Sequence, residues 1–315
     1  MADASYFARV PCPRRHLRRA VAATTVAALV LTLAGCAPRT LLLKGVADEL
    51  AGQGQAEEED LGLARDAAAF YLKLSESVLR QTPGHPALAE ALAGGFTQYA
   101  YAFVAFEAEK LEATDVRAAA RQRQRAARLY QRAQRHALAA LEVQQPGLAR
   151  ALAVPATAAA TAGSAPLRLA PQQVGLAYWA AASWGAFIAL SKDQPEVVAD
   201  LPLAMRLAAL AYDTAPEHGQ GSLAVLMAQF ELARPGGTAA AAERYLSRAD
   251  AASVTPAPAT LVTRAESLAL PAGDREAFER LLRQAIAAAV PRRDLASQVL
   301  RERAQWLLDT VDDRF

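Results

Sequence analysis

Clusters of proline and glycine divide most of this sequence into intervals the length of single helices. They are TPGHP at 82–86, QQPG at 144–147, KDQP at 192–195, APEHGQG at 215–221, RPGG at 234–237 and TPAP at 255–258. Most intervals are about fifteen to thirty residues long, which suits paired antiparallel helices. β-Branched residues are sparse, and no segment shows convincing strand alternation. The pattern therefore predicts an all-α fold.

Two of these clusters lie in similar surroundings. VLRQTPGHPALAEAL aligns with AYDTAPEHGQGSLAVL, so that Pro83 matches Pro216 and His85 matches His218. Each cluster closes one amphipathic helix and opens another, a layout typical of tetratricopeptide-like (TPR-like) repeats. A regular repeat period is absent, so the pattern predicts a TPR-like helical-hairpin solenoid or bundle with degenerate repeats.

The N-terminus has the pattern of a bacterial lipoprotein signal. Arginines precede an apolar run from Ala20 to Leu33, which leads into Leu-Ala-Gly and then Cys36. We expect cleavage before Cys36 and lipidation of its thiol, and we favour this over an uncleaved anchor or a twin-arginine signal. Cleavage would change the formal charge from +2 to −2, because five arginines and one aspartate leave. The basic pI is then no argument for nucleic acid. Cys12 also leaves, so no disulfide is expected.

Composition suggests five segments. We assign a signal peptide to 1–35, a lipidated tether to 36–56, an N-terminal helical part to 57–150, an irregular connector to 151–170 and a C-terminal TPR-like part to 171–315. The two helical parts are expected to form one compact domain. Ala37 follows the cysteine where an aspartate would favour inner-membrane retention, so we expect an anchor on the periplasmic face of the outer membrane.

Enzymatic chemistry finds little support in the sequence. After cleavage His85, His136 and His218 remain, and no spacing of histidine, cysteine and carboxylates indicates a metal site. No serine elbow, Walker loop or dinucleotide fingerprint occurs. The acidic runs at 57–60 and 312–313 lie in polar segments, where a solvated face is the simpler interpretation. We expect no catalytic residues, no metal and no cofactor.

A stripe of arginines occupies one face of a predicted helix. Its members, three or four residues apart, are Arg117, Arg121, Arg125, Arg128, Arg132 and Arg135. A solvated face is the simpler interpretation. Docking of an acidic partner or of lipid headgroups is the alternative, for which Arg121, Arg125, Arg128 and Arg132 are the candidates.

Two aromatic segments follow helical periodicity. Phe96, Tyr99, Phe103 and Phe106 form one stripe, which is more typical of a core than of a ligand pocket. The uncharged run at 174–190 spans about 26 Å as a helix, which is marginal for a bilayer. We therefore expect a buried helix, apolar all round. Its two tryptophans, five residues apart, point to different faces.

Several phrases resemble one family. They are GGFTQYAYAFVAFEAE (94–109), YWAAASWGAFIALSKDQPEVVADLP (178–202) and RERAQWLLDTVDDRF (301–315), together with DAAAFYLKLSESVLRQTPGHPAL (66–88) and the Leu-Ala-Gly-Cys motif. In this order they resemble the T component of tripartite ATP-independent periplasmic (TRAP) transporters, over most of the mature chain. The sequence departs from that pattern in its connector, which is low in charge, and at Ala224, where a histidine is expected.

The resemblance implies a homotrimeric helical scaffold that docks the solute-binding P component, with a hydrophobic ligand channel in each protomer. An adaptor for outer-membrane or envelope assembly is the alternative function. Six side chains are expected to converge near a cavity between the two helix sets: Gln98, Tyr99, Tyr101, Tyr178, Trp179 and Trp184. Asp193 and Asp200 are further docking candidates, although fixing or capping the turn into the next helix is their simpler role.

Overall fold

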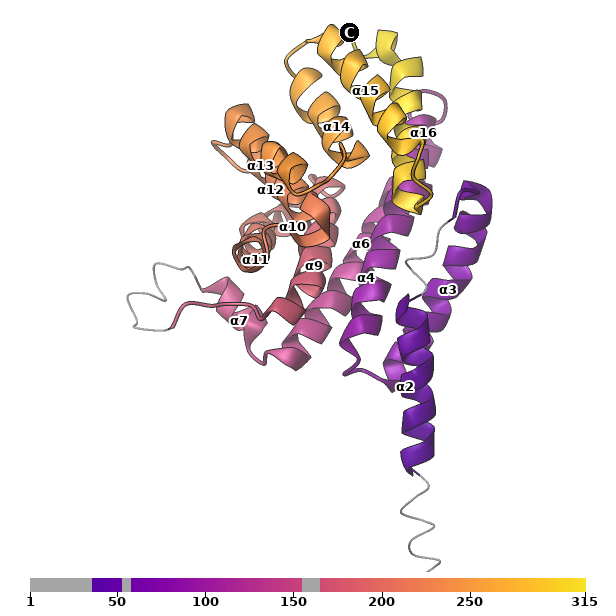
Figure 1. Ribbon diagram of the computed structural model, residues 1–315, viewed down its shortest axis with the longest axis vertical. Coiled ribbons are helices and arrows are strands. Elements are labelled where there is room, and N and C mark those ends of the chain that lie inside the picture. The colour runs from indigo at the N-terminus through magenta and orange to yellow at the C-terminus, as the bar shows by residue number, and fades with distance from the viewer. Residues whose placement is uncertain (1–35, 53–57, 155–164) are drawn as a thin grey trace, which may run out of the picture. The chain divides into compact units, whose positions relative to one another are not determined.

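The described parts of the protein are built from helices. The computed structural model describes residues 36–52, 58–154 and 165–315, and every regular element within these ranges is helical (Figure 1). The predicted all-α class is thereby confirmed. Residues 1–35, where a signal peptide containing Cys12 is predicted, residues 53–57, and residues 155–164 of the predicted connector lie outside the described residues.

The chain divides into two compact units, Met1–Val46 and Ala47–Phe315. In the first unit the described residues, 36–46, belong to helix α2 (Cys36–Gly52). Its remaining residues belong to the second unit, in which Ala47 and Leu50 are buried in the main core. All further elements lie in the second unit.

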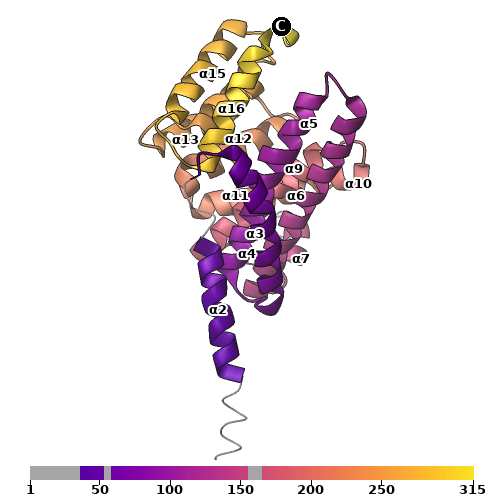
Figure 2. The same ribbon diagram turned by 90° about the vertical axis from the view of Figure 1, so that its right-hand side faces the viewer.

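Three long helices form the centre of the second unit. Helix α6 (Val116–Gln144) packs against both α4 (Pro86–Ala100) and α9 (Val174–Ala189), and α9 also packs against α11 (Leu201–Thr214). Helix α3 (Leu61–Gln81) lies along α4 (Figure 2). The buried side chains between them are mainly leucine and alanine, such as Leu92, Ala133, Leu176, Ala180 and Leu207. Alanine at the crossings lets the helix axes approach closely.

Shorter elements connect these helices. They are the π-helical turn η2 (Tyr101–Ala105), α5 (Phe106–Leu111), α7 (Leu148–Ala153), η3 (Pro171–Gln173), α10 (Pro195–Val198) and η4 (His218–Gly221). Several begin at the proline and glycine clusters. In TPGHP, Nδ1 of His85 accepts a hydrogen bond from the backbone N–H of Leu88 at 3.1 Å, and Pro86 takes the first helical position of α4. A capping side chain of this kind contributes about 1 kcal/mol to stability.

The C-terminal helices pack mainly with their neighbours along the chain. Helix α12 (Ser222–Ala233) pairs with α13 (Ala239–Ala251), and α14 (Pro258–Arg264) continues through the π-helical turn η5 (Ala265–Ala269). Helices α15 (Arg275–Ala289) and α16 (Leu295–Asp309) close the chain, followed by η6 (Val311–Asp313). Phe278, Leu282 and Leu307 form the centre of a separate hydrophobic cluster in α14–α16.

Helix α9 makes close contacts on more than one side. A Cβ atom at Gly94 of α4 would lie 2.8 Å from Cε2 of Trp179, and one at Gly185 would lie 2.9 Å from Cε1 of Phe230 in α12. Trp184 is buried, with 7% of its surface exposed. Trp179 packs against the same core in which Trp184 is buried. The helix is largely enclosed, as its composition predicts.

Candidate functional site

One group of the predicted ligand residues lies on the first half of α9. The rings of Tyr178 and Trp179 meet edge to face with centroids 4.8 Å apart, and Tyr178 also lies 5.5 Å from the ring of His218 in η4. Trp179 rests against Gly94 of α4. Burial raises the pKa of Tyr178 to about 12, so its hydroxyl stays neutral and able to donate. This group combines apolar ring faces with polar edges.

A second group lies where α4 runs into η2. Tyr99 meets Phe103 edge to face at 5.5 Å, and Nη2 of Arg125 lies 3.5 Å from the Tyr99 hydroxyl. The guanidinium of Arg303 stands 5.7 Å from the Tyr101 ring centroid. Burial raises the pKa of Tyr101 to about 12. A π-helical turn begins at Tyr101, and such turns are frequent at functional sites.

The other two predicted residues occupy different positions. Trp184 belongs to the main core, where its Nε1 is buried and has no hydrogen-bond partner among the described residues. Gln98 is half-buried on α4. Tyr99, Tyr178 and Trp179 border the same core as Trp184, whereas Tyr101 borders two smaller clusters. The structure thus distributes the six over two aromatic groups and the core, and their convergence on one cavity stays a prediction.

Two surface cavities stand out, and none of the six lines either of them. The larger, of about 540 Å³, is shallow and borders the end of α6 and η3. Its lining residues are Gln144, Gln145, Arg168, Leu169, Ala170, Gln172 and Gln173. The smaller, of about 230 Å³, lies between α12 and α13.

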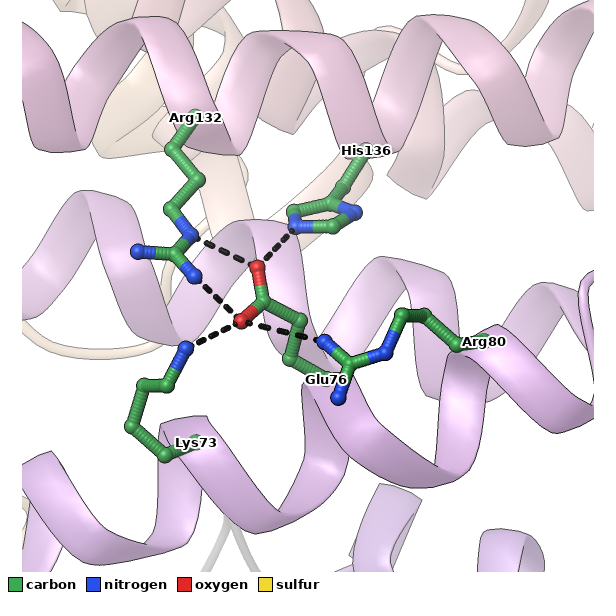
Figure 3. A network of polar contacts seen from close by, with 5 residues as sticks. All are labelled: Lys73, Glu76, Arg80, Arg132 and His136. Atoms are coloured by element: carbon green, nitrogen blue, oxygen red, sulfur yellow. Dashed lines mark hydrogen bonds and ion pairs between the residues drawn. The ribbon is translucent and has the colours of Figure 1, made fainter.

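A buried carboxylate anchors the basic stripe of α6 to α3. Glu76 is 7% exposed at its side chain and accepts from Nε of Arg132 at 2.6 Å, from Nη2 of the same guanidinium, and from Nζ of Lys73 at 2.6 Å. Nε2 of His136 lies 3.0 Å from its Oε1, and Nη1 of Arg80 lies 3.8 Å from its Oε2 (Figure 3). One carboxylate therefore faces three permanent cations and a histidine.

The electrostatic balance at Glu76 follows from these contacts. Burial alone would raise the pKa of Glu76, but hydrogen bonds from Arg132, Lys73 and His136 outweigh it and lower the pKa to about 2. Burial lowers the pKa of His136, against the hydrogen bond with Glu76. Phe96 completes the arrangement, since Arg132 lies 5.0 Å from its ring centroid and His136 stacks on it at 6.1 Å. The group keeps a surplus of positive charge.

The other docking candidates on α6 are solvent-exposed. Arg121 and Arg128 form no ion pair or side-chain hydrogen bond with any residue that the structure describes, and Arg125 reaches the neutral hydroxyl of Tyr99. Among the four docking candidates of the stripe, Arg132 is fixed, and the other three are exposed cations on the preceding turns. Their charge is uncompensated within the described chain.

The two carboxylates predicted as docking candidates, Asp193 and Asp200, follow α9 and do not cap a helix. Asp193 is exposed in the turn after α9, and the N-cap position of α10 is Gln194. Asp200 occupies the N-cap position of α11 but makes no capping hydrogen bond. Its backbone has φ −80° and ψ −9°, because the chain passes from α10 into α11 in a nearly helical conformation. An N-cap side chain reaches the free N–H groups from an extended backbone, so the expected capping role of Asp200 is wrong.

The sequence-based selection of sites missed several buried charged residues, among them Arg303 and Glu76. Arg303 on α16 donates to Glu266 of η5 at 2.6 and 3.0 Å and to Glu109 of α5 at 2.9 Å, and Glu76 forms the group described above. Arg303 is four residues from both Val299 and Leu307, and Glu76 is four from Leu72 and three from Leu79. A charge inside an apolar stripe was the signal that could have identified them.

Two further findings concern metal binding and the crossing of a membrane. Within the described ranges, no group of three or more histidine, cysteine and carboxylate side chains is arranged to hold a metal ion. None of the helices described combines the length and apolar character that crossing a bilayer requires.

In its described residues the protein is thus all-helical, with a core rich in leucine and alanine, two aromatic groups and a basic helix face. The sequence profile of the TRAP transporter T-component family matches residues 57–315, and the chain belongs to this family. The family is an accessory in transport and is not a known enzyme family. An uncharacterized protein of Treponema pallidum (strain Nichols) is 29% identical over 272 residues, which is 82% of this chain and 81% of that protein.

Proposed function

We propose that this T component is a lipid-anchored scaffold on the periplasmic face of the outer membrane, where it docks the solute-binding P component of its transporter. The family supports a role in TRAP transport. The lipoprotein motif that ends at Cys36 supports the anchor.

The observation that carries docking is the exposed charge on α6. Arg121 and Arg128 lie on one helical face with Arg132, which buried Glu76 fixes in place. Uncompensated cations such as Arg121 and Arg128, beside the fixed Arg132, attract an acidic surface. They steer the approach of the partner and favour one orientation of docking. No carboxylate stands three or four residues from Arg121 or Arg128 on α6 to balance their charge.

Copurification tests the docking. The full chain is co-expressed with the P component, and retained P component is quantified after solubilisation in detergent. R121E/R128E is expected to lose the complex, whereas the charge-matched control R280E/R301E on α15 and α16 keeps it. Recovery of outer-membrane assembly factors without the P component would instead favour the envelope-adaptor alternative and overturn the proposal.

We also propose a TPR-like solenoid that assembles as a homotrimer. The sequential packing of α12 to α16 supports the solenoid, because stacked helix pairs contact mainly their neighbours. Helix α3 supports association, because Leu63, Phe70 and Leu74 form an apolar stripe that is 57%, 70% and 38% exposed. An apolar stripe of this kind is stabilised when a second copy covers it.

The proposed small-molecule site is apolar and lies beside Tyr178 and Trp179. Their edge-to-face rings against Gly94 offer ring surface together with the Tyr178 hydroxyl and the Trp179 N–H, which suits an amphipathic ligand. Native mass spectrometry of the protein reports oligomer size and retained ligand together. W179A is expected to lose the retained mass, and a ligand retained equally by W179A would contradict this site.

A further inference from the structure

A cavity with three arginines lies between α12 and α13, which run side by side in Figure 1. Its volume is about 230 Å³, and its lining residues are Glu231, Arg234, Ala241, Arg244, Tyr245 and Arg248. It shares no residue with the aromatic groups or with the basic stripe of α6.

The single carboxylate in the cavity is already neutralised. Arg234 donates to Glu231 through Nε and Nη2, both at 2.7 Å, and the backbone N–H of Thr238 lies 3.4 Å from Oε1. The hydrogen bonds from Arg234 lower the pKa of Glu231, which keeps the carboxylate ionised. Because the charges of Glu231 and Arg234 cancel, Arg244 and Arg248 determine the net charge of the cavity.

Arg244 and Arg248 are held by neutral acceptors. Nη1 of Arg244 donates to the carbonyl of Ala240 at 3.3 Å, and Nη1 of Arg248 donates to the hydroxyl of Tyr212 at 3.3 Å. Tyr212 meets Tyr245 edge to face at 5.6 Å. These contacts orient the guanidinium groups without cancelling their charge. Neither arginine forms an ion pair with a residue in the described part of the chain.

The acidic residues of α13 are turned away from this pair. Arg264 of α14 binds Glu243 at 2.7 Å and Asp250 at 2.7 Å. Glu243 and Asp250 are seven residues apart and share one face of α13, while Arg244 and Arg248 are one turn apart on another. The carboxylates of α13 therefore face α14, whereas Arg244 and Arg248 face the cavity.

We propose that this cavity binds a small oxyanion, with Arg244 and Arg248 as its ligands. Guanidinium groups present two parallel N–H donors that match the oxygens of a carboxylate or a phosphate. The Tyr212 hydroxyl accepts from Arg248 and so supports the site by orienting that side chain. Carboxylates and phosphates share this chemistry, and the experiment distinguishes them. The site does not depend on the proposed docking function.

Isothermal titration calorimetry of the full chain in detergent tests the site. Inorganic phosphate and succinate are titrated separately at constant ionic strength set with chloride. Saturable binding of either anion above the chloride background is expected, and the one that binds identifies the class. Each arginine removed, in R244A and in R248A, is expected to weaken binding roughly tenfold, because charge-assisted hydrogen bonds are among the strongest.

Two further variants separate the site from general charge effects. R301A removes an exposed arginine on α16 and is expected to bind like the unmodified protein. Y212F keeps the ring and removes the acceptor that orients Arg248, so binding should weaken a few-fold while the melting temperature stays close to normal. Absence of saturable binding for both anions, or an equal loss in R301A and R244A, would overturn the proposal.

Discussion

Glu76 is a residue whose chemistry is strongly set by its neighbours. Its carboxylate is buried, yet Arg132, Lys73 and His136 lie close enough to stabilise the ionised form. Removing one partner of a buried ion pair destabilises a protein strongly, because the remaining charges lose their compensation. Arg132, held by Glu76, is the fixed residue among the docking candidates of the basic stripe.

Replacing Glu76 by glutamine is expected to lower the free energy of unfolding by about 2–4 kcal/mol. The amide keeps the shape but leaves Arg132, Lys73 and Arg80 to repel one another. Urea unfolding followed by circular dichroism measures the loss. The control E112Q removes a carboxylate whose pair with Arg123 is largely exposed, and its cost should stay below about 1 kcal/mol. Equal costs for the two variants would contradict the role of Glu76.

Glu76 should also make stability depend on pH in acid. Its pKa in the folded protein is about 2, against 4.5 for the free group. The ionised carboxylate therefore stabilises the fold fully above pH 4.5, and this contribution, about 3 kcal/mol, is lost as the pH falls towards 2. Unfolding free energies measured between pH 5 and 2 should fall less steeply for E76Q. Burial lowers the pKa of His136, so its protonation also costs stability as the pH falls below 6.5, the value of the free group.

Among the elements, α9 depends on small residues at its crossings. Its contacts with α4 at Gly94 and with α12 at Gly185 leave no room for a Cβ atom, since Trp179 and Phe230 fill the space. Phe230 is itself 4% exposed and cannot move aside freely. Gly94 of α4 and Gly185 of α9 are therefore packing residues, and they set how closely these helices approach their neighbours.

G185A is expected to lower the free energy of unfolding by about 1–3 kcal/mol, because overpacking forces side chains or backbone to shift. A decrease in the free energy of unfolding would be informative, because alanine in place of glycine inside a helix otherwise stabilises by up to about 1 kcal/mol. Thermal unfolding gives the measurement. The control G45A in α2, where no atom lies within 4 Å of the new Cβ, should show no loss. A G185A protein as stable as the unmodified one would show that the crossing is looser than described.

At the scale of the whole molecule, association is expected to depend on the exposed face of α3. The apolar stripe of Leu63, Phe70 and Leu74 is exposed on this face, and Phe70 is 70% exposed. Contiguous exposed apolar surface is typical of association surfaces. The stripe and the basic face of α6 give the protein two chemically different surfaces, one suited to a second copy and one to an acidic partner.

F70D is expected to convert the proposed trimer into monomers, because a carboxylate in an apolar interface loses its hydration without gaining a partner. Light scattering after size-exclusion chromatography measures the mass. Val254 is fully exposed outside α3, so V254D should leave the mass unchanged. A trimer that persists in F70D would place the interface elsewhere, and a monomeric unmodified protein would contradict the trimer itself.

The sequence by itself determined the helical class, the positions of most turns and the basic face of α6. Proline, glycine and capping residues act on backbone groups within about four residues, and helical spacing places side chains on faces whatever the rest of the chain does. His85 and Pro86 start α4 for such local reasons. The buried character of α9 follows from its composition in the same way.

Only the tertiary structure decided which charges meet and which aromatic residues share a surface. Arg132 lies 56 residues from Glu76, and Arg303 lies 194 residues from Glu109, so their pairing depends on which helix faces pack together. The same packing separates the group of Tyr99 from that of Tyr178. Asp200 fails to cap α11 because the turn before it remains helical. Local interactions select helices, whereas the geometry of packing selects contacts across the chain, and no short stretch of sequence contains that geometry.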